Sequence, residues 1–104
     1  MAPVRVCGTS DLPVGEARRF EAGGAEVCVV NLGDDGFRAV AAECSHAHAY
    51  LDEGEVDLDL ATIECPLHGS TFDLQTGAPK TLPATQPVAT YPVTVADGDV
   101  LIEV

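Results

Sequence analysis

The chain of 104 residues carries a formal net charge of −12, because seventeen Asp and Glu outnumber five Lys and Arg. Such a charge repels phosphate backbones and anionic lipids, which argues against nucleic-acid and membrane binding and favours basic protein partners; the alternative is that the acidic residues serve solubility alone. Apolar residues make up 46% of the chain, and ten Gly and seven Pro separate short apolar runs. We therefore expect a single β-rich domain over residues 1–104.

The first half of the chain predicts antiparallel strands joined by tight turns. Short apolar or alternating runs cover residues 4–7, 17–22, 25–30 and 37–42. The sequence GDDG at residues 33–36 is typical of a turn, because Gly tolerates positive φ and Asp accepts local backbone hydrogen bonds. This turn should link two paired strands.

The pattern changes in the second half. Residues 45–60, SHAHAYLDEGEVDLDL, are acidic and weakly patterned, whereas ATIEC and TFDL resemble strands that enter and leave the segment PLHGS. This predicts a small inserted lobe at about residues 43–84. Residues 77–87, GAPKTLPATQP, have three Pro and no strand pattern, so we expect a restrained loop there.

The C-terminal sequence VATYPVTVADGDVLIEV predicts a closing hairpin around ADGD. Strands at both ends of the chain can pair in one sheet. The sequence has no internal repeat and no convincing amphipathic helix. The predicted fold class is therefore all-β.

The chain has no apolar run typical of a signal peptide in MAPVRVCGTS, and no later run long enough to span a membrane. We therefore expect a soluble, cytoplasmic protein. In the cytoplasm thiols stay reduced, so four Cys, two of them near His, favour metal ligation over two disulfides.

Two short segments place Cys and His at a spacing typical of metal ligands. One residue separates Cys44 from His46, two separate Cys65 from His68, and eighteen lie between His46 and Cys65. Two loops that each offer one thiolate and one imidazole can meet at their tips and hold a metal centre. Spacing alone does not decide between His46 and His48 as the first imidazole ligand.

The segments CSH at residues 44–46 and CPLHGSTFDLQTG at residues 65–77 resemble the two cluster-binding loops of Rieske proteins, and closely those of bacterial Rieske-type ferredoxins. The resemblance extends more weakly over the rest of the chain. It implies a Rieske-like antiparallel β-sandwich with a small cluster-binding lobe and one [2Fe-2S] cluster per chain.

The resemblance also implies which residues bind the cluster: Cys44 and Cys65 would bind one iron, and His46 and His68 the other. It favours His46 over His48, which would then be a surface residue of the loop. The thiolates cancel the two positive charges of an oxidised cluster core, so neutral imidazoles leave the oxidised site neutral. Four thiolates would make it doubly negative and harder to reduce, above all in so acidic a protein.

The same resemblance implies a low reduction potential. High-potential Rieske proteins have two further Cys, which form a disulfide that braces the loops, and a Tyr whose hydroxyl bonds to a ligand sulfur. This sequence has Ala49, Leu67 and Phe72 at those positions, while Ser70 retains a hydroxyl that raises the potential somewhat. We expect a potential near the bottom of the Rieske range, at about −150 mV.

Such a protein is an electron carrier and not itself a catalyst. The resemblance implies transfer from a ferredoxin reductase to a terminal oxygenase of the aromatic-ring-hydroxylating kind, through transient, electrostatically steered encounters of a monomer. One alternative is a Rieske ferredoxin accessory to iron-sulfur cluster assembly or nitrite reduction. Another is a structural zinc module, which the pairing of one Cys with one His in each loop disfavours.

Five apolar residues near the motifs have two alternative interpretations. Ala47, Ala49, Tyr50, Leu67 and Pro83 form either an apolar collar over the cluster or ordinary loop packing. The ligand His residues should lie at an exposed tip, which is the predicted docking face.

Two further Cys and two Gly have structural interpretations. Cys7 and Cys28 lie within strand patterns without a neighbouring His, so we expect buried free thiols rather than a second metal site or a disulfide. Gly69 and Gly77 are expected to permit tight turns.

Overall fold

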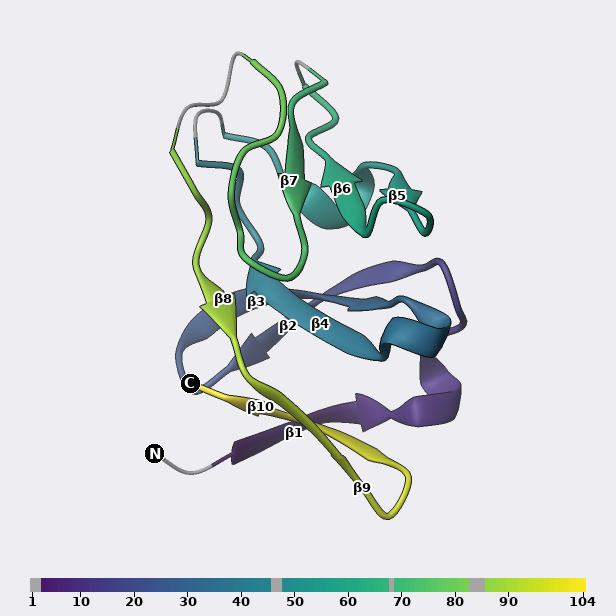
Figure 1. Ribbon diagram of the computed structural model, residues 1–104. Coiled ribbons are helices and arrows are strands. Elements are labelled where there is room, and N and C mark those ends of the chain that lie inside the picture. Colours follow the sequence, from purple (N-terminus) through teal and green to yellow (C-terminus); the bar gives the residue numbers. More distant parts are fainter. Residues whose placement is uncertain (1–2, 46–47, 68, 83–85) are drawn as a thin grey trace.

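The computed structural model describes residues 3–45, 48–67, 69–82 and 86–104. Within these residues the chain forms ten β-strands and three short 3₁₀ helices (Figure 1). The strands are β1 (Pro3–Gly8), β2 (Ala17–Ala22), β3 (Ala25–Asn31), β4 (Phe37–Ala41), β5 (Val56–Asp57), β6 (Thr62–Glu64), β7 (Thr71–Asp73), β8 (Thr90–Tyr91), β9 (Val93–Ala96) and β10 (Asp99–Glu103). The helices are η1 (Thr9–Asp11), η2 (Gly33–Asp35) and η3 (Leu51–Glu53). No helix in the described part of the chain is long and apolar enough to cross a membrane.

Two antiparallel sheets, in the orders β1-β10-β9 and β2-β3-β4-β8, form the lower part of the molecule in Figure 1, which we call the sandwich. Its core lies between them and includes Leu12, Val27, Val29, Val100 and Ile102, all fully buried. β1 pairs with β10, so strands from both ends of the chain meet in one sheet as predicted.

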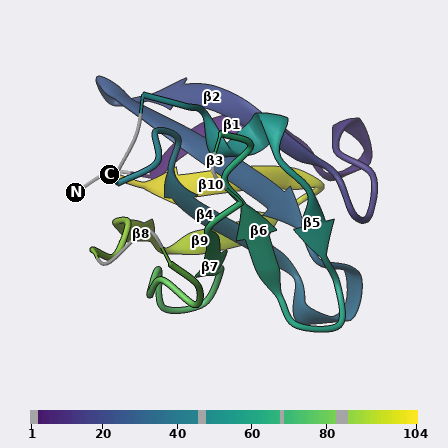
Figure 2. The ribbon, with the colours of Figure 1, turned by 90° about the horizontal axis from the view of Figure 1, so that it is seen from above.

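A third sheet, in the order β5-β6-β7, lies above the sandwich together with η3; we call this part the lobe (Figure 1). The view from above in Figure 2 shows the lobe in front of the sandwich sheets. The lobe has its own core, which includes Leu51, Ile63, Phe72 and Leu74.

Strand β3 contributes to both cores because successive side chains of a strand point to opposite faces. Val27 and Val29 belong to the sandwich core, whereas Cys28 and Val30 belong to the core under the lobe. The continuous apolar run of β3 therefore provides the surface on which the lobe is built.

The all-β prediction is confirmed, and β1 to β4 lie where the sequence patterns predicted strands. The GDDG turn forms η2 and joins β3 to its partner β4, and β9 and β10 form the predicted closing hairpin.

The C-terminal segment differs from the prediction in one respect. Tyr91 pairs with Ala39 of β4, whereas Val93 pairs with Ile102 of β10. Pro92 lies between them and has no N–H for a sheet, so the apolar run divides into two strands of different sheets. The short strand β5 was not predicted, because its two residues are too few for a period-2 pattern.

Candidate metal centre

The first candidate loop leaves the end of β4 and is closed at its base by backbone bonds. The Cys44 N–H donates to the Ala49 carbonyl at 2.8 Å, and the Leu51 N–H donates to the Ala42 carbonyl at 2.8 Å. A β-bridge between Glu43 and Tyr50 completes the base. The side chain of Cys44 is buried, so its sulfur lies inside the protein rather than in solvent.

The second candidate loop connects β6 to β7. The Cys65 N–H donates to the Ser70 carbonyl at 2.6 Å, and the Gly69 N–H donates to the Cys65 carbonyl at 3.0 Å. Cys65 and Ser70 are fully buried. Gly69 has φ of +77°, and a Cβ there would meet no described atom within 4 Å, so this turn needs glycine for its backbone conformation alone.

The structure brings the two cysteines, twenty-one residues apart in sequence, into one core. Cys44 and Cys65 pack there with Leu51, Phe72 and other apolar side chains of the lobe. His46, Ala47, His68 and Pro83 lie outside the described residues. The assignment of the four ligands therefore stays a prediction.

The Cys and His residues of the two loops fit a Rieske cluster, which requires two kinds of ligand, better than a metal site that requires only one kind. Each hairpin provides a buried thiol at its base, at Cys44 and Cys65, and a His two or three positions further along the chain. Because each hairpin carries one Cys and one His, the two thiolates can bind one iron and the two imidazoles a second, chemically different iron.

A third segment, residues 77–87, is joined to both hairpins. At one end the Thr71 N–H donates to the Thr81 hydroxyl at 2.9 Å, and the Lys80 N–H donates to the Thr71 carbonyl at 2.7 Å. At the other end the Ser45 hydroxyl donates to the Gln86 carbonyl at 2.6 Å. A restrained loop was predicted here, but these contacts, which link the segment to both candidate loops, were not.

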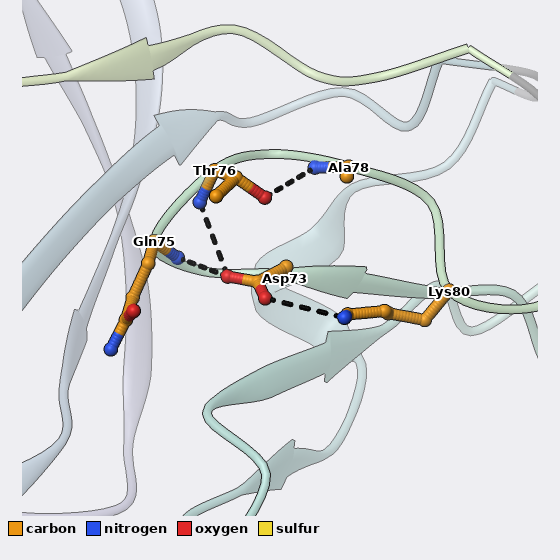
Figure 3. Close-up of polar contacts among 5 residues, drawn as sticks. All are labelled: Asp73, Gln75, Thr76, Ala78 and Lys80. Atoms are coloured by element: carbon orange, nitrogen blue, oxygen red, sulfur yellow. Dashed lines mark hydrogen bonds and ion pairs between the residues drawn. The ribbon is translucent and has the colours of Figure 1, made fainter.

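The turn after β7 is organised by one carboxylate, as Figure 3 shows. Asp73 Oδ1 accepts the N–H groups of Gln75 at 2.7 Å and Thr76 at 3.1 Å, and Lys80 Nζ lies 3.6 Å from Oδ2. Partial burial alone would raise the pKa of Asp73, but these hydrogen bonds and the Lys80 charge outweigh it, so the pKa lies below its usual value. An Asp whose carboxylate accepts the N–H of the residue two positions later is typical of such a turn. This turn was not predicted from the sequence.

Gly77 is required by a close approach of two backbone segments. Its φ is +78°, its N–H donates to the Asp73 carbonyl, and its carbonyl accepts the Val88 N–H at 2.9 Å. A Cβ at this position would collide with the Val88 carbonyl oxygen. The prediction that Gly69 and Gly77 permit tight turns is confirmed, and the two positions need glycine for different reasons.

The residues proposed as an apolar collar differ in burial. Ala49 and Tyr50 pack against the lobe core, as expected for ordinary loop packing, whereas Leu67 is 56% exposed. Leu82, which the sequence analysis did not single out, is 78% exposed. Thr81, next to Leu82, places its hydroxyl 3.5 Å from the Gly69 carbonyl, so Leu82 adjoins the second candidate loop, to which Leu67 belongs.

Tyr50 also contacts a cation from the sandwich. The Arg19 guanidinium carbon lies 3.7 Å from the centroid of the Tyr50 ring. Arg19 Nη1 is buried and has no hydrogen-bond partner among the described residues. This cation–π contact thus connects β2 to the base of the first candidate loop.

His48 is fully exposed, and its Nδ1 lies 3.2 Å from Glu43 Oε2. This position is compatible with the predicted surface role of His48, and the choice of His46 as ligand stays a prediction.

Cys7 and Cys28 are buried free thiols, as predicted. Burial raises the pKa of Cys28 to about 12, with a smaller contribution from the Asp52 charge, so this thiol is protonated at neutral pH. Among the described residues, no group of three or more His, Cys, Asp or Glu is placed to hold a metal ion.

Comparison with known proteins agrees with this arrangement. Residues 2–92 match the Rieske [2Fe-2S] domain. The chain is 42% identical over 103 residues, 99% of its length and 94% of the relative's, to the 3-phenylpropionate/cinnamic acid dioxygenase ferredoxin subunit of Shigella flexneri.

Two solved structures are similar over nearly their whole length. The ferredoxin of carbazole 1,9a-dioxygenase from Nocardioides aromaticivorans IC177 has 42% identity and a TM-score of 0.93, with 98% of this chain and 97% of that chain covered. A chain from a complex of reduced oxygenase and oxidised ferredoxin in carbazole 1,9a-dioxygenase has 39% identity and a TM-score of 0.87, with 96% and 100% covered.

The chain therefore belongs to the Rieske [2Fe-2S] domain family. It is a ferredoxin of the kind found in ring-hydroxylating dioxygenase systems, an electron carrier with a [2Fe-2S] cluster and not a catalytic subunit. The sequence-based predictions of family, fold class, cofactor and electron-transfer role are confirmed.

Proposed function

We propose that this ferredoxin accepts one electron from a ferredoxin reductase and delivers it to the terminal oxygenase of an aromatic-ring-hydroxylating system. The observation that carries the proposal is the pair of closed hairpins that bury Cys44 and Cys65 in one core. The near-complete coverage of dioxygenase ferredoxins by this chain supports the same function. Those relatives favour this pathway over cluster assembly or nitrite reduction.

In this proposal Cys44 and Cys65 hold one iron, and His46 and His68 the other. When bound, the cluster supplies reversible one-electron transfer. The protein's part is to keep the ligand loops in one geometry, through the backbone bonds at Cys44 and Cys65, and to exclude water beneath them with buried Leu51 and Phe72. A site whose geometry stays the same when the cluster gains or loses an electron has a small reorganisation energy.

The docking face in this proposal is the tip of the lobe, where Leu67 and Leu82 are exposed. Exposed leucines at the edge of a redox centre allow a partner to exclude water on contact, while the acidic surface steers a basic partner toward it. We further propose that the protein is a single-domain, cytoplasmic monomer, in keeping with its acidic surface and the expected reduced state of its thiols.

Anaerobic purification, iron and zinc analysis and electron paramagnetic resonance test the function. We expect two irons per chain, a low-average-g Rieske signal on reduction and a midpoint potential near about −150 mV. Reduction by a partner reductase should slow as salt increases. Zinc in a colourless protein would contradict the proposal, and a potential above zero would contradict its low-potential assignment.

The ligands are tested by comparing two neighbouring His variants. His46→Ala should abolish the Rieske spectrum, whereas His48→Ala should preserve it, because His48 is fully exposed beside Glu43. The reverse result would make His48 the ligand.

A further inference from the structure

An open groove runs along one side of the lobe, between the β5–β6 turn and the segment that follows β7. Its volume is about 830 Å³. Leu58 and Leu60 from the turn line one end, and Thr71, Lys80 and Thr81 line the other. The two leucines remain 42% and 68% exposed, respectively, so the groove offers apolar surface that this chain does not cover itself.

The turn that presents these leucines is preformed. Asp57 Oδ1 accepts the N–H groups of Asp59 at 2.9 Å and Leu60 at 3.0 Å. Ala61 follows with φ of +54°, and its carbonyl accepts the Leu74 N–H at 2.9 Å, which attaches the end of the turn to the lobe core. A partner that binds here meets an ordered surface, so binding loses little free energy to the ordering of this turn.

The groove is bordered by negative charge. Glu55, Asp57, Asp59 and Glu64 line it, and none of them forms an ion pair among the described residues. The one cation of the lining, Lys80, already lies 3.6 Å from Asp73 outside the groove. A complementary segment therefore carries Lys or Arg on its edges and apolar side chains at its centre.

The groove is continuous with the second ligand loop. Lys80 and Thr81 at its inner end are hydrogen-bonded to Thr71, and the Thr81 hydroxyl lies 3.5 Å from the Gly69 carbonyl. A protein seated on the tip beside Leu67 and Leu82 can therefore extend a segment into the groove without leaving the lobe surface.

We propose that this groove is a second docking surface, which binds a mixed basic and apolar segment of a redox partner that docks at the cluster tip. The proposal rests on the proposed electron-transfer function. The tip brings the redox centres together, whereas the groove adds area and fixes the orientation of the partner on the acidic lobe.

The test uses the oxidised holoprotein and the labelled peptide KLKLKLK as probe, with KSKSKSK and ELELELE for comparison. At low salt we expect KLKLKLK to bind tightest, and its amide chemical-shift changes to fall on residues 56–60, 71 and 80–81. Shifts confined to the sandwich, or equal binding of KLKLKLK and KSKSKSK, would overturn the proposal.

Variants with matched controls separate this site from general charge attraction. Glu55→Gln with Asp59→Asn should weaken peptide binding about threefold to tenfold, whereas Asp34→Asn with Asp35→Asn in η2, an equal change in net charge, should weaken it by less than about twofold. Equal losses in the two double variants would overturn the proposal.

A second pair of variants tests the apolar part. Leu58→Thr with Leu60→Thr should weaken binding of KLKLKLK, whereas Val14→Thr with Val95→Thr, which alters similarly exposed apolar residues outside the groove, should leave it unchanged. All variants should retain the Rieske spectrum and potential. A missing Rieske signal would refute the proposed function, whereas a normal signal without groove binding would refute only this inference.

Discussion

The sandwich and the lobe share strand β3 but are stabilised by different means. In the sandwich, β2 and β3 pair over six residues in continuous register, and the buried core between the sheets is mostly aliphatic. In the lobe, the strands are two or three residues long and are supplemented by turns, hydrogen bonds from side chains to the backbone and the two hairpins that contain Cys44 and Cys65. Small assemblies of this kind depend on local constraints and bound metal more than long sheets do.

This difference between the sandwich and the lobe corresponds to their different roles. The sandwich provides a rigid base, because its buried apolar side chains and the continuous pairing of β2 with β3 resist local opening. The lobe presents cysteines on hairpins whose geometry is set by a few specific contacts. Four perturbations, from the largest expected effect to the smallest, sharpen this contrast.

Removal of the cluster should affect the lobe far more than the sandwich. In Cys65→Ser we expect loss of the Rieske spectrum and rapid hydrogen exchange at Gly69 and Leu51, while the amides of Val27 and Val29 in β3 remain protected. Hydrogen exchange followed by nuclear magnetic resonance measures both regions in one sample. Equal loss of protection in the two regions would mean that they unfold as one unit.

Substitution of Gly77 in the lobe should be more damaging than substitution of a glycine in the sandwich hairpin. Gly77→Ala combines positive φ with a collision against the Val88 carbonyl, so we expect a loss of about 3 kcal/mol or more in the free energy of unfolding. Gly24→Ala, in the sandwich hairpin, also has positive φ but meets no described atom within 4 Å, and should cost about 1 kcal/mol. Denaturant unfolding of both holoproteins compares them, and similar losses would show that the lobe backbone can relax.

Adjacent arginines of β2 test the connection between the two regions. Arg19→Gln removes the cation from the Tyr50 ring and should reduce stability by about 1 kcal/mol. Arg18→Gln changes the net charge equally but loses only exposed contacts, an ion pair with Glu16 at 3.9 Å and a hydrogen bond to the Asp11 carbonyl at 3.0 Å, so its effect should be smaller, about 0.5 kcal/mol. Thermal unfolding would detect the difference, and indistinguishable variants would argue against the Arg19 contact.

The smallest effect is the pH dependence from Asp73. Because its pKa is lower in the folded protein, the unfolded chain binds more protons, and the stabilisation by Asp73 is present above its unfolded pKa of about 3.9 and is lost as pH falls through the folded pKa. Asp73→Asn retains an oxygen that can accept from Gln75 and Thr76 but does not titrate. Its stability should therefore decline less between about pH 4.5 and 3 than that of the wild type, measured in urea. Parallel declines would assign the acid sensitivity to other groups.

The sequence alone determined those features that depend on neighbouring residues. Alternation of apolar side chains located β1 to β4, and Gly and Asp located the η2 turn and the closing hairpin. The segments CSH and CPLHGSTFDLQTG indicated the family by their resemblance to Rieske cluster-binding loops. These signals are local, because side-chain periodicity and turn conformation are properties of a few consecutive residues.

The tertiary structure decided which distant residues meet. The Ser45 bond to Gln86, the stacking of Arg19 on Tyr50 and the approach of Gly77 to Val88 each join segments that carry no mutual pattern in the sequence. The separation of β8 from β9 at Pro92 likewise depends on two different sheets, because β8 pairs with β4 in one and β9 pairs with β10 in the other. Such contacts arise because the lobe packs on the second face of β3. The periodicity of apolar residues within one segment does not encode them.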